Sequence, residues 1–120
     1  MSVREILFRG KRVDNGEWVY GDLIHHDGYV AIWDKNVSYV GDFEVIPKTV
    51  GQYTGLTDKN GNKIFEGDIL EQDVVQSGTP HREFVEWDYD LLGNRYDEWS
   101  AFFEIIGNIH DNPELLEVEK

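Results

Sequence analysis

The sequence predicts a mainly β fold, a small turn-rich antiparallel barrel or sandwich with at most one or two short helical turns. Turn signals recur along the chain, among them Asn15-Gly16 and Asp27-Gly28, short alternating apolar runs lie between them, and helix signals are sparse. The strongest turn signal is Asn60-Gly61, because both residues tolerate the positive φ of a type I′ turn. Around that loop we expect Asp58 opposite Lys63 and Thr57 opposite Ile64, with charges beside the turn and apolar side chains beyond it.

Further strands are predicted on both sides of this hairpin from the alternation of apolar and polar residues. They are Ile6–Gly10, Glu17–Ile24, Tyr29–Trp33, Tyr39–Ile46, Ile69–Val75, His81–Tyr89 and Trp99–Ile109. The apolar residues of the last segment also fit a helix, so an α+β fold is the alternative. Its β-branched and aromatic residues, with Gly107, favour a strand. Pro47 ends one strand, and Pro113–Glu117 is typical of a single helical turn.

The length and composition predict one domain, residues 1–120, since 40% of the 120 residues are apolar. No apolar run approaches the ~20 residues that span a bilayer, and the first residues lack the apolar stretch of a signal peptide. The chain has no cysteine, which excludes disulfides, thiolate metal sites and a thiol nucleophile. We therefore expect a soluble protein that acts inside the cell, away from membranes.

The net charge of −13 is distributed unevenly. Residues 1–63 carry eight Lys/Arg and nine Asp/Glu, a net of −1, whereas residues 64–120 carry three and fifteen, a net of −12. The start of the chain holds a basic cluster of Arg4, Arg9, Lys11 and Arg12. So acidic a chain disfavours direct binding to DNA or anionic membranes. The acidic half could dock on a basic partner, meet the basic start of a neighbouring subunit, or only maintain solubility.

Three blocks of the sequence carry a resemblance to a known family. They are Arg4–Gly21 (REILFRGKRVDNGEWVYG), Ile46–Leu70 (IPKTVGQYTGLTDKNGNKIFEGDIL) and Ile106–Leu116 (IGNIHDNPELL). Together they resemble the YopX family, small proteins encoded mainly by bacteriophages and prophages. The resemblance implies a β-rich protein of the bacterial cytoplasm and carries no established reaction. The matched positions are interpreted as structural: Gly10, Trp18, Gly51, Gly55, Gly61, Glu66, Gly67, Asp68, Gly107, Asn108, Asp111, Asn112 and Pro113.

Metal binding has little support in the sequence. His25 and His26 are adjacent, so on a strand their side chains point to opposite faces and cannot chelate one ion. A composite site of His25 or His26 with His81 and His110 would require the fold to bring them together. The segment Asp58-Lys59-Asn60-Gly61-Asn62 resembles a calcium loop, but Lys63 and Ile69 occupy the positions of its glycine and bidentate carboxylate. We predict no metal and no cofactor.

Catalytic residues are likewise not predicted, and we expect no enzyme. The chain has no GxSxG, P-loop or GxGxxG sequence. Carboxylate pairs are common, as composition alone predicts: Glu66/Asp68, Asp88/Asp90 and Asp97/Glu98. Asp88 and Asp90 share one face of a predicted strand. With His81 they give the weakest of our hypotheses, a metal-dependent hydrolase.

The aromatic residues are expected in the core or in a subunit interface. These rings could stack nucleic-acid bases. Glu83 and Glu86, however, directly precede Phe84 and Trp87, and their negative charge would repel the phosphates. The rings concerned are Trp18, Tyr20, Trp33, Phe84, Trp87 and Tyr89.

The main hypothesis for the function is a non-enzymatic accessory protein that binds protein, either its own copies or a host or phage partner, and forms homo-oligomers. The alternative is an acidic mimic of DNA that occupies a basic cleft of a host protein.

Overall fold

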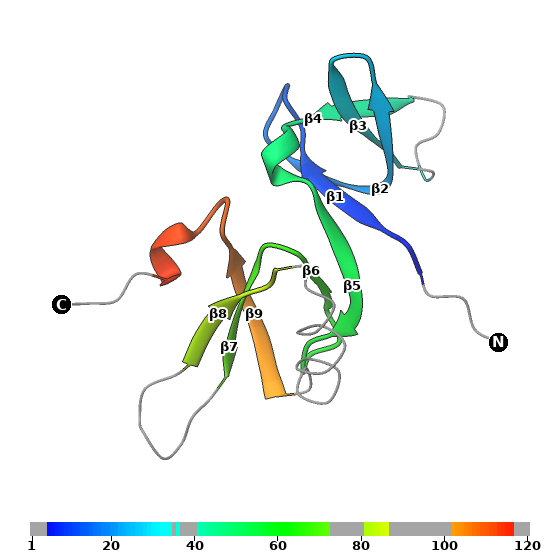
Figure 1. Ribbon diagram of the computed structural model, residues 1–120. Coiled ribbons are helices and arrows are strands. Elements are labelled where there is room, and N and C mark those ends of the chain that lie inside the picture. Colours follow the sequence, from blue (N-terminus) through cyan, green and yellow to red (C-terminus); the bar gives the residue numbers. More distant parts are fainter. Residues whose placement is uncertain (1–4, 35, 37–40, 73–80, 87–101, 117–120) are drawn as a thin grey trace. The chain divides into compact units, whose positions relative to one another are not determined.

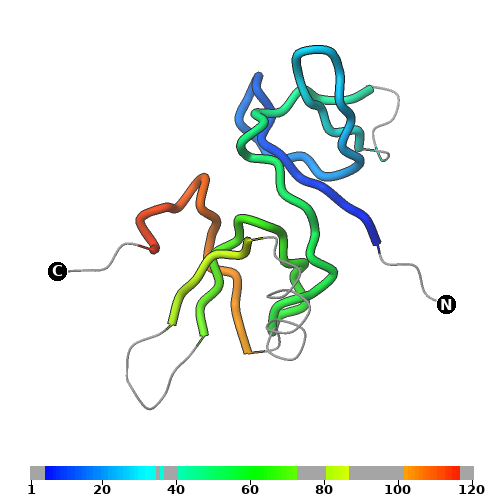
Figure 2. Tube along the Cα trace, viewed as in Figure 1, coloured from blue at the N-terminus to red at the C-terminus, as the bar shows by residue number. Residues whose placement is uncertain are grey.

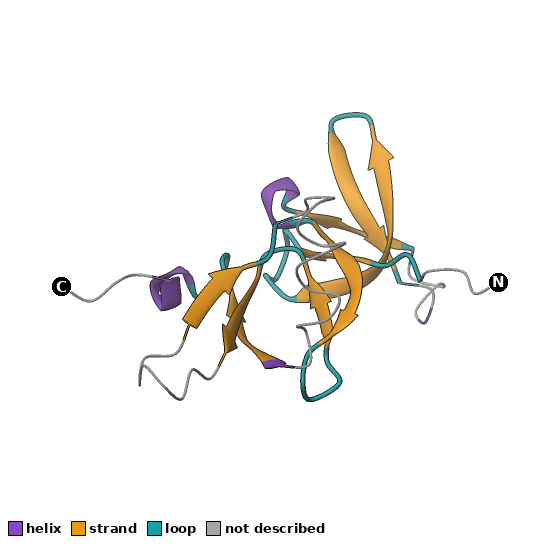
Figure 3. Ribbon diagram, turned by 60° about the horizontal axis from the view of Figure 1, so that its bottom comes forward, coloured by secondary structure: helices purple, strands orange, loops and turns teal. Residues whose placement is uncertain are grey.

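The computed structural model describes residues 5–34, 36, 41–72, 81–86 and 102–116 (Figure 1). The chain divides into two compact units, Met1–Tyr53 (unit 1) and Thr54–Lys120 (unit 2), and strand β5 (Gly51–Thr57) runs across the division. The described residues are mainly β-strands, and the strand pairs β1–β2, β2–β3, β3–β4, β7–β8 and β7–β9 are all antiparallel. The helical segments of the described residues are short (Figure 3). This confirms the predicted fold class. A single domain over residues 1–120 stays a prediction.

Unit 1 is built on an antiparallel meander of four strands, β1 (Phe8–Lys11), β2 (Trp18–His26), β3 (Tyr29–Trp33) and β4 (Asp42–Val45), each paired with the next (Figure 2). The residues after β1 lie beside β4. The N–H of Val13 donates to the Glu44 carbonyl at 3.0 Å, and Arg12 forms an isolated antiparallel bridge with Val45. The meander therefore curls until its first and last strands touch at this isolated bridge. Among the described residues neither sheet closes into a barrel, so the structure does not support the closed barrel.

The core of unit 1 includes Ile32 and Val45, which are almost fully buried. Glycine permits the close packing around them. A Cβ placed on Gly10 would lie 3.0 Å from the Val45 Cβ, and one on Gly21 would lie 2.0 Å from the Trp33 carbonyl oxygen. At Gly21 the backbones of β2 and β3 thus approach each other more closely than any side chain would allow.

The predicted turns of unit 1 are confirmed. Asp27-Gly28 forms the two-residue loop between β2 and β3, with His26 paired to Tyr29 and Gly28 at φ +88°. Pro47 ends the extended segment and begins η2 (Pro47–Thr49), a short 3-10 turn. The first strand begins two residues later than predicted, at Phe8, and the prediction that it begins at Ile6 is wrong.

Unit 2 contains β6 (Lys63–Phe65), β7 (Asp68–Gln72), β8 (His81–Phe84), β9 (Phe103–Asn108) and the 3-10 turn η4 (Pro113–Leu116). β6 pairs with β5, and β7 lies between β8 and β9 in a three-stranded sheet. β9 confirms the strand within the predicted segment, and the described residues contain only short 3-10 turns in place of the helices that an α+β fold would need. The ends of the predicted segments toward Val75 and Tyr89 lie outside the described residues. The core cluster consists of Ile64, Leu70, Val85 and Phe103, with Leu56 and Ile105 packed against it.

The predicted type I′ turn at Asn60-Gly61 is wrong. Gly61 has φ +83°, but no described residue other than glycine has positive φ. The N–H of Gly61 donates to the Asp58 carbonyl at 3.0 Å, and the N–H of Asp58 donates to the Asn62 carbonyl at 2.8 Å. This is a three-residue loop, a tight turn followed by a left-handed glycine. Asp58 therefore lies opposite Asn62, and the predicted pairing with Lys63 is displaced by one residue.

Candidate functional site

Two cations and two aromatic rings lie on one face of the β1–β2 hairpin in unit 1. Arg9 pairs with Tyr20 and Lys11 with Trp18, and directly opposed residues of an antiparallel pair point to the same side of the sheet. The Arg9 guanidinium carbon lies 4.7 Å from the centroid of the Trp18 ring, and the Lys11 ammonium nitrogen lies 5.9 Å from it. We call these four residues the basic–aromatic face.

Trp18 holds both cations in place on this face. A cation over an indole ring gains about 0.5–1 kcal/mol at exposed sites and more where water is excluded. Arg9 is buried, at 6% exposed, whereas Lys11 is partly exposed and Tyr20 is 43% exposed. The accessible groups of the face are therefore the Lys11 ammonium and the phenol ring of Tyr20.

Arg12 belongs to a different environment, although it follows Lys11 directly. Its Nε and Nη2 donate to the two carboxylate oxygens of Asp14 at 2.9 and 2.6 Å. These hydrogen bonds raise the pKa of Arg12 and lower the pKa of Asp14. The guanidinium also lies 4.2 Å from the Phe43 ring centroid. Because Asp14 balances its charge, Arg12 does not extend the basic–aromatic face.

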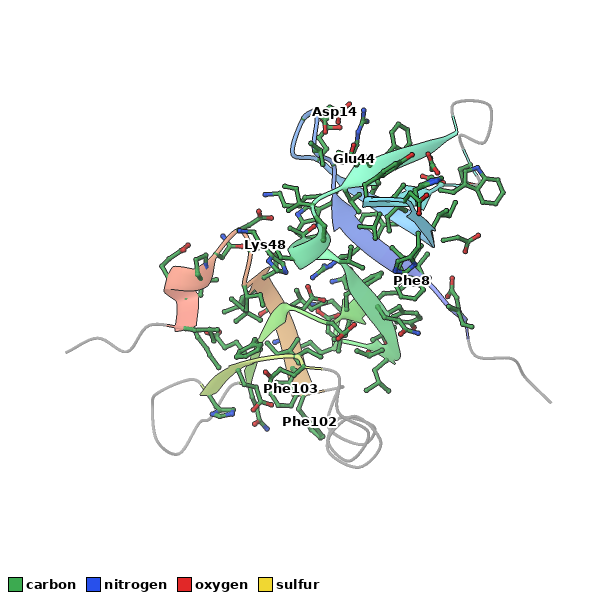
Figure 4. The ribbon with its side chains drawn as sticks, turned by 45° about the horizontal axis from the view of Figure 1, so that its top comes forward. Phe8, Asp14, Glu44, Lys48, Phe102 and Phe103 are labelled. Carbon is green, nitrogen blue, oxygen red and sulfur yellow. The ribbon has the colours of Figure 1, made fainter. Side chains whose placement is uncertain are left out.

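The turn η2 brings a further lysine next to β1. The backbone N–H of Lys11 donates to Thr49 Oγ1 at 2.9 Å, and that hydroxyl donates to the Ile46 carbonyl at 2.6 Å. Thr49 is buried by these contacts, whereas its neighbour Lys48 is exposed (Figure 4). The hydrogen bond between Lys11 and Thr49 thus attaches η2, which contains Lys48, to β1.

Two of the four histidines lie close to an acidic side chain of their own unit. His26 Nε2 lies 2.7 Å from Asp42 Oδ2, and its ring stacks on Tyr29 with centroids 4.5 Å apart. In unit 2, His81 Nε2 lies 3.2 Å from Glu83. Within the described part of the chain, no three His, Asp or Glu side chains come close enough together to hold a metal ion. That the protein uses no metal stays a prediction.

Two of the candidate carboxylates have structural partners. Asp58 is 4% exposed; its Oδ1 accepts the N–H groups of Asn60 and Asn62 at 2.9 Å each, and its Oδ2 accepts that of Ile105 at 3.1 Å. Asp68 is 2% exposed and accepts the Phe65 N–H at 2.7 Å. The Asp58 carboxylate therefore binds backbone N–H groups of its own hairpin and of β9, and does not act as part of a calcium loop. The candidate pairs Asp88/Asp90 and Asp97/Glu98 lie outside the described residues.

The hydrogen bonds to Asp58 predict how stability depends on pH. Burial raises the pKa of Asp58, but the three backbone donors outweigh burial and hold the pKa below its usual 3.8. The stabilisation is thus complete above the unfolded-state pKa and is lost as pH falls through the folded one. We expect the urea midpoint of the wild type to fall more steeply below about pH 4 than that of Asp58→Asn. Parallel curves for the two proteins would contradict this.

Acidic side chains on the described sheet of unit 2 have basic neighbours. Arg82 Nε donates to Glu71 at 2.7 Å, and the Lys59 ammonium lies 3.9 Å from Glu104. These exposed pairs contribute little to stability. The sequence of residues 64–120 carries three Lys/Arg against fifteen Asp/Glu, a net charge of −12.

The basic–aromatic face was not predicted as a unit from the sequence. Its signal is the spacing of Arg9 and Lys11, two residues apart, opposite Trp18 and Tyr20, also two residues apart. That spacing places all four side chains on one face only if the hairpin has the observed register. The register depends on the loop between the strands, where Gly16 has φ +73° and donates its N–H to the Arg12 carbonyl at 3.0 Å.

Comparison with known proteins places the chain in a family. In its described part, the chain forms no helix long and apolar enough to cross a membrane. The fold is similar to the crystal structure of protein EF1440 from Enterococcus faecalis, with a TM-score of 0.53, 24% identity, and coverage of 96% of this chain and 100% of that one. No curated protein matches the sequence. The family model described as YopX protein matches residues 7–117. The chain therefore belongs to the YopX family.

Proposed function

We propose that this chain is a non-enzymatic accessory protein of phage or prophage origin, which acts in the bacterial cytoplasm by binding protein and forming homo-oligomers. The basic–aromatic face carries the proposal. Aromatic rings and arginine are enriched in protein interfaces, and Arg9, Trp18 and Tyr20 occur together on one strand pair. The acidic second half supplies the opposite charge, −12 over residues 64–120.

The charge distribution makes the proposed assembly dependent on salt. The Debye length falls from about 30 Å at 10 mM to about 3 Å at 1 M salt, so attraction between oppositely charged surfaces of two subunits is screened. We expect a molar mass above that of the 14.0 kDa chain at low salt and a return to the monomer mass at high salt. Light scattering coupled to gel filtration measures both. A monomer at low and high salt alike would refute self-assembly.

Mimicry of DNA is the second candidate function, and the observation that favours it is the excess of carboxylates in residues 64–120. Such a surface would occupy the basic cleft of a DNA-binding protein and compete with DNA. A tagged pull-down from nuclease-treated bacterial lysate tests it. One stoichiometric basic DNA-binding protein, released by added DNA, would support mimicry; a partner that DNA does not displace would refute it.

A further inference from the structure

We propose that the basic–aromatic face (Arg9, Lys11, Trp18 and Tyr20) is a docking surface for carboxylate-rich protein, and that its occupant is the acidic second half of another copy of this chain. The inference rests on the proposed function and deepens it by naming the surface and its partner. It requires one surface that presents positive charge in a fixed geometry, and a partner with excess negative charge.

The geometry of the face suits carboxylates. The Lys11 ammonium lies 5.9 Å from the Trp18 ring centroid, and the buried Arg9 guanidinium lies 4.7 Å from the same centroid. The contact with the ring orders Lys11, so less side-chain freedom is lost when an anion binds there. The 43% exposed Tyr20 ring lies on the same face and adds apolar area and a hydroxyl. Single-stranded nucleic acid is disfavoured as the partner because the chain carries a net charge of −13.

The charge of the chain identifies the occupant. Residues 64–120 carry a net −12, whereas residues 1–63 carry only −1 and include every cation of the face. A second copy therefore always brings a complementary partner at the same concentration. Contact of the first half of one copy with the second half of the next is heterologous, so each copy can use both surfaces.

A charge reversal with a matched control tests the surface. Lys11→Glu reverses a cation of the face but keeps the backbone N–H that donates to Thr49. Lys63→Glu makes the same change at an exposed position of β6. At low salt we expect Lys11→Glu to weaken self-association at least about tenfold and Lys63→Glu not to weaken it, as measured by sedimentation velocity. Circular dichroism must show both variants folded.

The indole N–H signal of Trp18 in NMR spectra reports on the face itself. Trp18→Phe identifies that signal among those of the four tryptophans. We expect it to shift as the wild-type concentration rises at low salt. Self-association that Lys11→Glu and Lys63→Glu weaken equally would overturn the docking surface and leave self-assembly standing. A monomer whose Trp18 signal shifts only with added oligoglutamate would overturn the second copy as occupant. A monomer whose signal shifts with neither would overturn the inference and the proposed self-assembly together.

Discussion

Replacing Gly21 by alanine is expected to disrupt the sheet of unit 1. The added Cβ would lie 2.0 Å from the Trp33 carbonyl oxygen, 2.8 Å from its carbon and 3.1 Å from the Asp34 Cα. These are backbone atoms, which cannot rotate away as a side chain can. Relief requires β2 and β3 to separate where Asp22 pairs with Trp33. We expect a loss of about 3 kcal/mol, the upper end for overpacked sites, measured by urea unfolding.

Gly28→Ala is the control for the steric clash at Gly21, because it measures the cost of a side chain at positive φ without a clash. Gly28 has φ +88°, but a Cβ added there would have no neighbouring atom within 4 Å. Alanine at this position meets only the strain of a left-handed backbone, about 1–2 kcal/mol. If Gly21→Ala is no more destabilising than Gly28→Ala, the close approach of β2 and β3 at Trp33 is refuted.

Replacing Asp58 by alanine is expected to destabilise unit 2 by about 3–5 kcal/mol. The carboxylate accepts three backbone N–H groups, two from its own hairpin and one from Ile105 of β9. Alanine leaves these donors without their acceptor, and an unsatisfied buried donor costs about 1–3 kcal/mol. Since Ile105 packs on the core cluster, the loss also frees β9 from the hairpin. Urea unfolding measures the change.

Asp58→Asn is the matched control for the shape of this site. Its side-chain oxygen can still accept the N–H groups of Asn60 and Asn62, but its amide N–H₂ opposes the N–H of Ile105. We therefore expect a smaller loss than for alanine, with the effect concentrated on β9. Hydrogen exchange should show faster exchange at Ile105 than at Asn62. Equal losses for the two variants would contradict the separate roles of the two carboxylate oxygens.

The sequence predicted those features of the fold that local chemistry determines. Asp27-Gly28 set the β2–β3 loop and Pro47 ended the extended segment, because positive φ and a missing N–H act within a few residues. The turn at Asn60-Gly61 was placed correctly, but its type and register were wrong. The Asp58 side chain decides them, and its hydrogen bonds include one to Ile105, 47 residues away. A contact at that distance leaves no mark in the local pattern.

The candidate site shows the same limit. Arg9 and Trp18 were both noted in the sequence, one as part of a basic cluster and the other among the aromatic residues. Their contact follows from the register of β1 and β2, and side-chain alternation predicts that register only once the loop length is known. Arg12 belongs to the same cluster in sequence, yet its hydrogen bonds to Asp14 separate it from the face.

Zero-length cross-linking with a carbodiimide is the most direct test of docking between copies, because it joins a lysine to a carboxylate only where the two touch. An equal mixture of unlabelled and ¹⁵N-labelled protein, cross-linked at low salt, distinguishes links between copies from links within one. We predict mixed-isotope peptides that join Lys11 to carboxylates of residues 64–120, and their loss at high salt. Mixed-isotope links that avoid Lys11, or links from Lys11 only within one copy, would contradict docking on the basic–aromatic face.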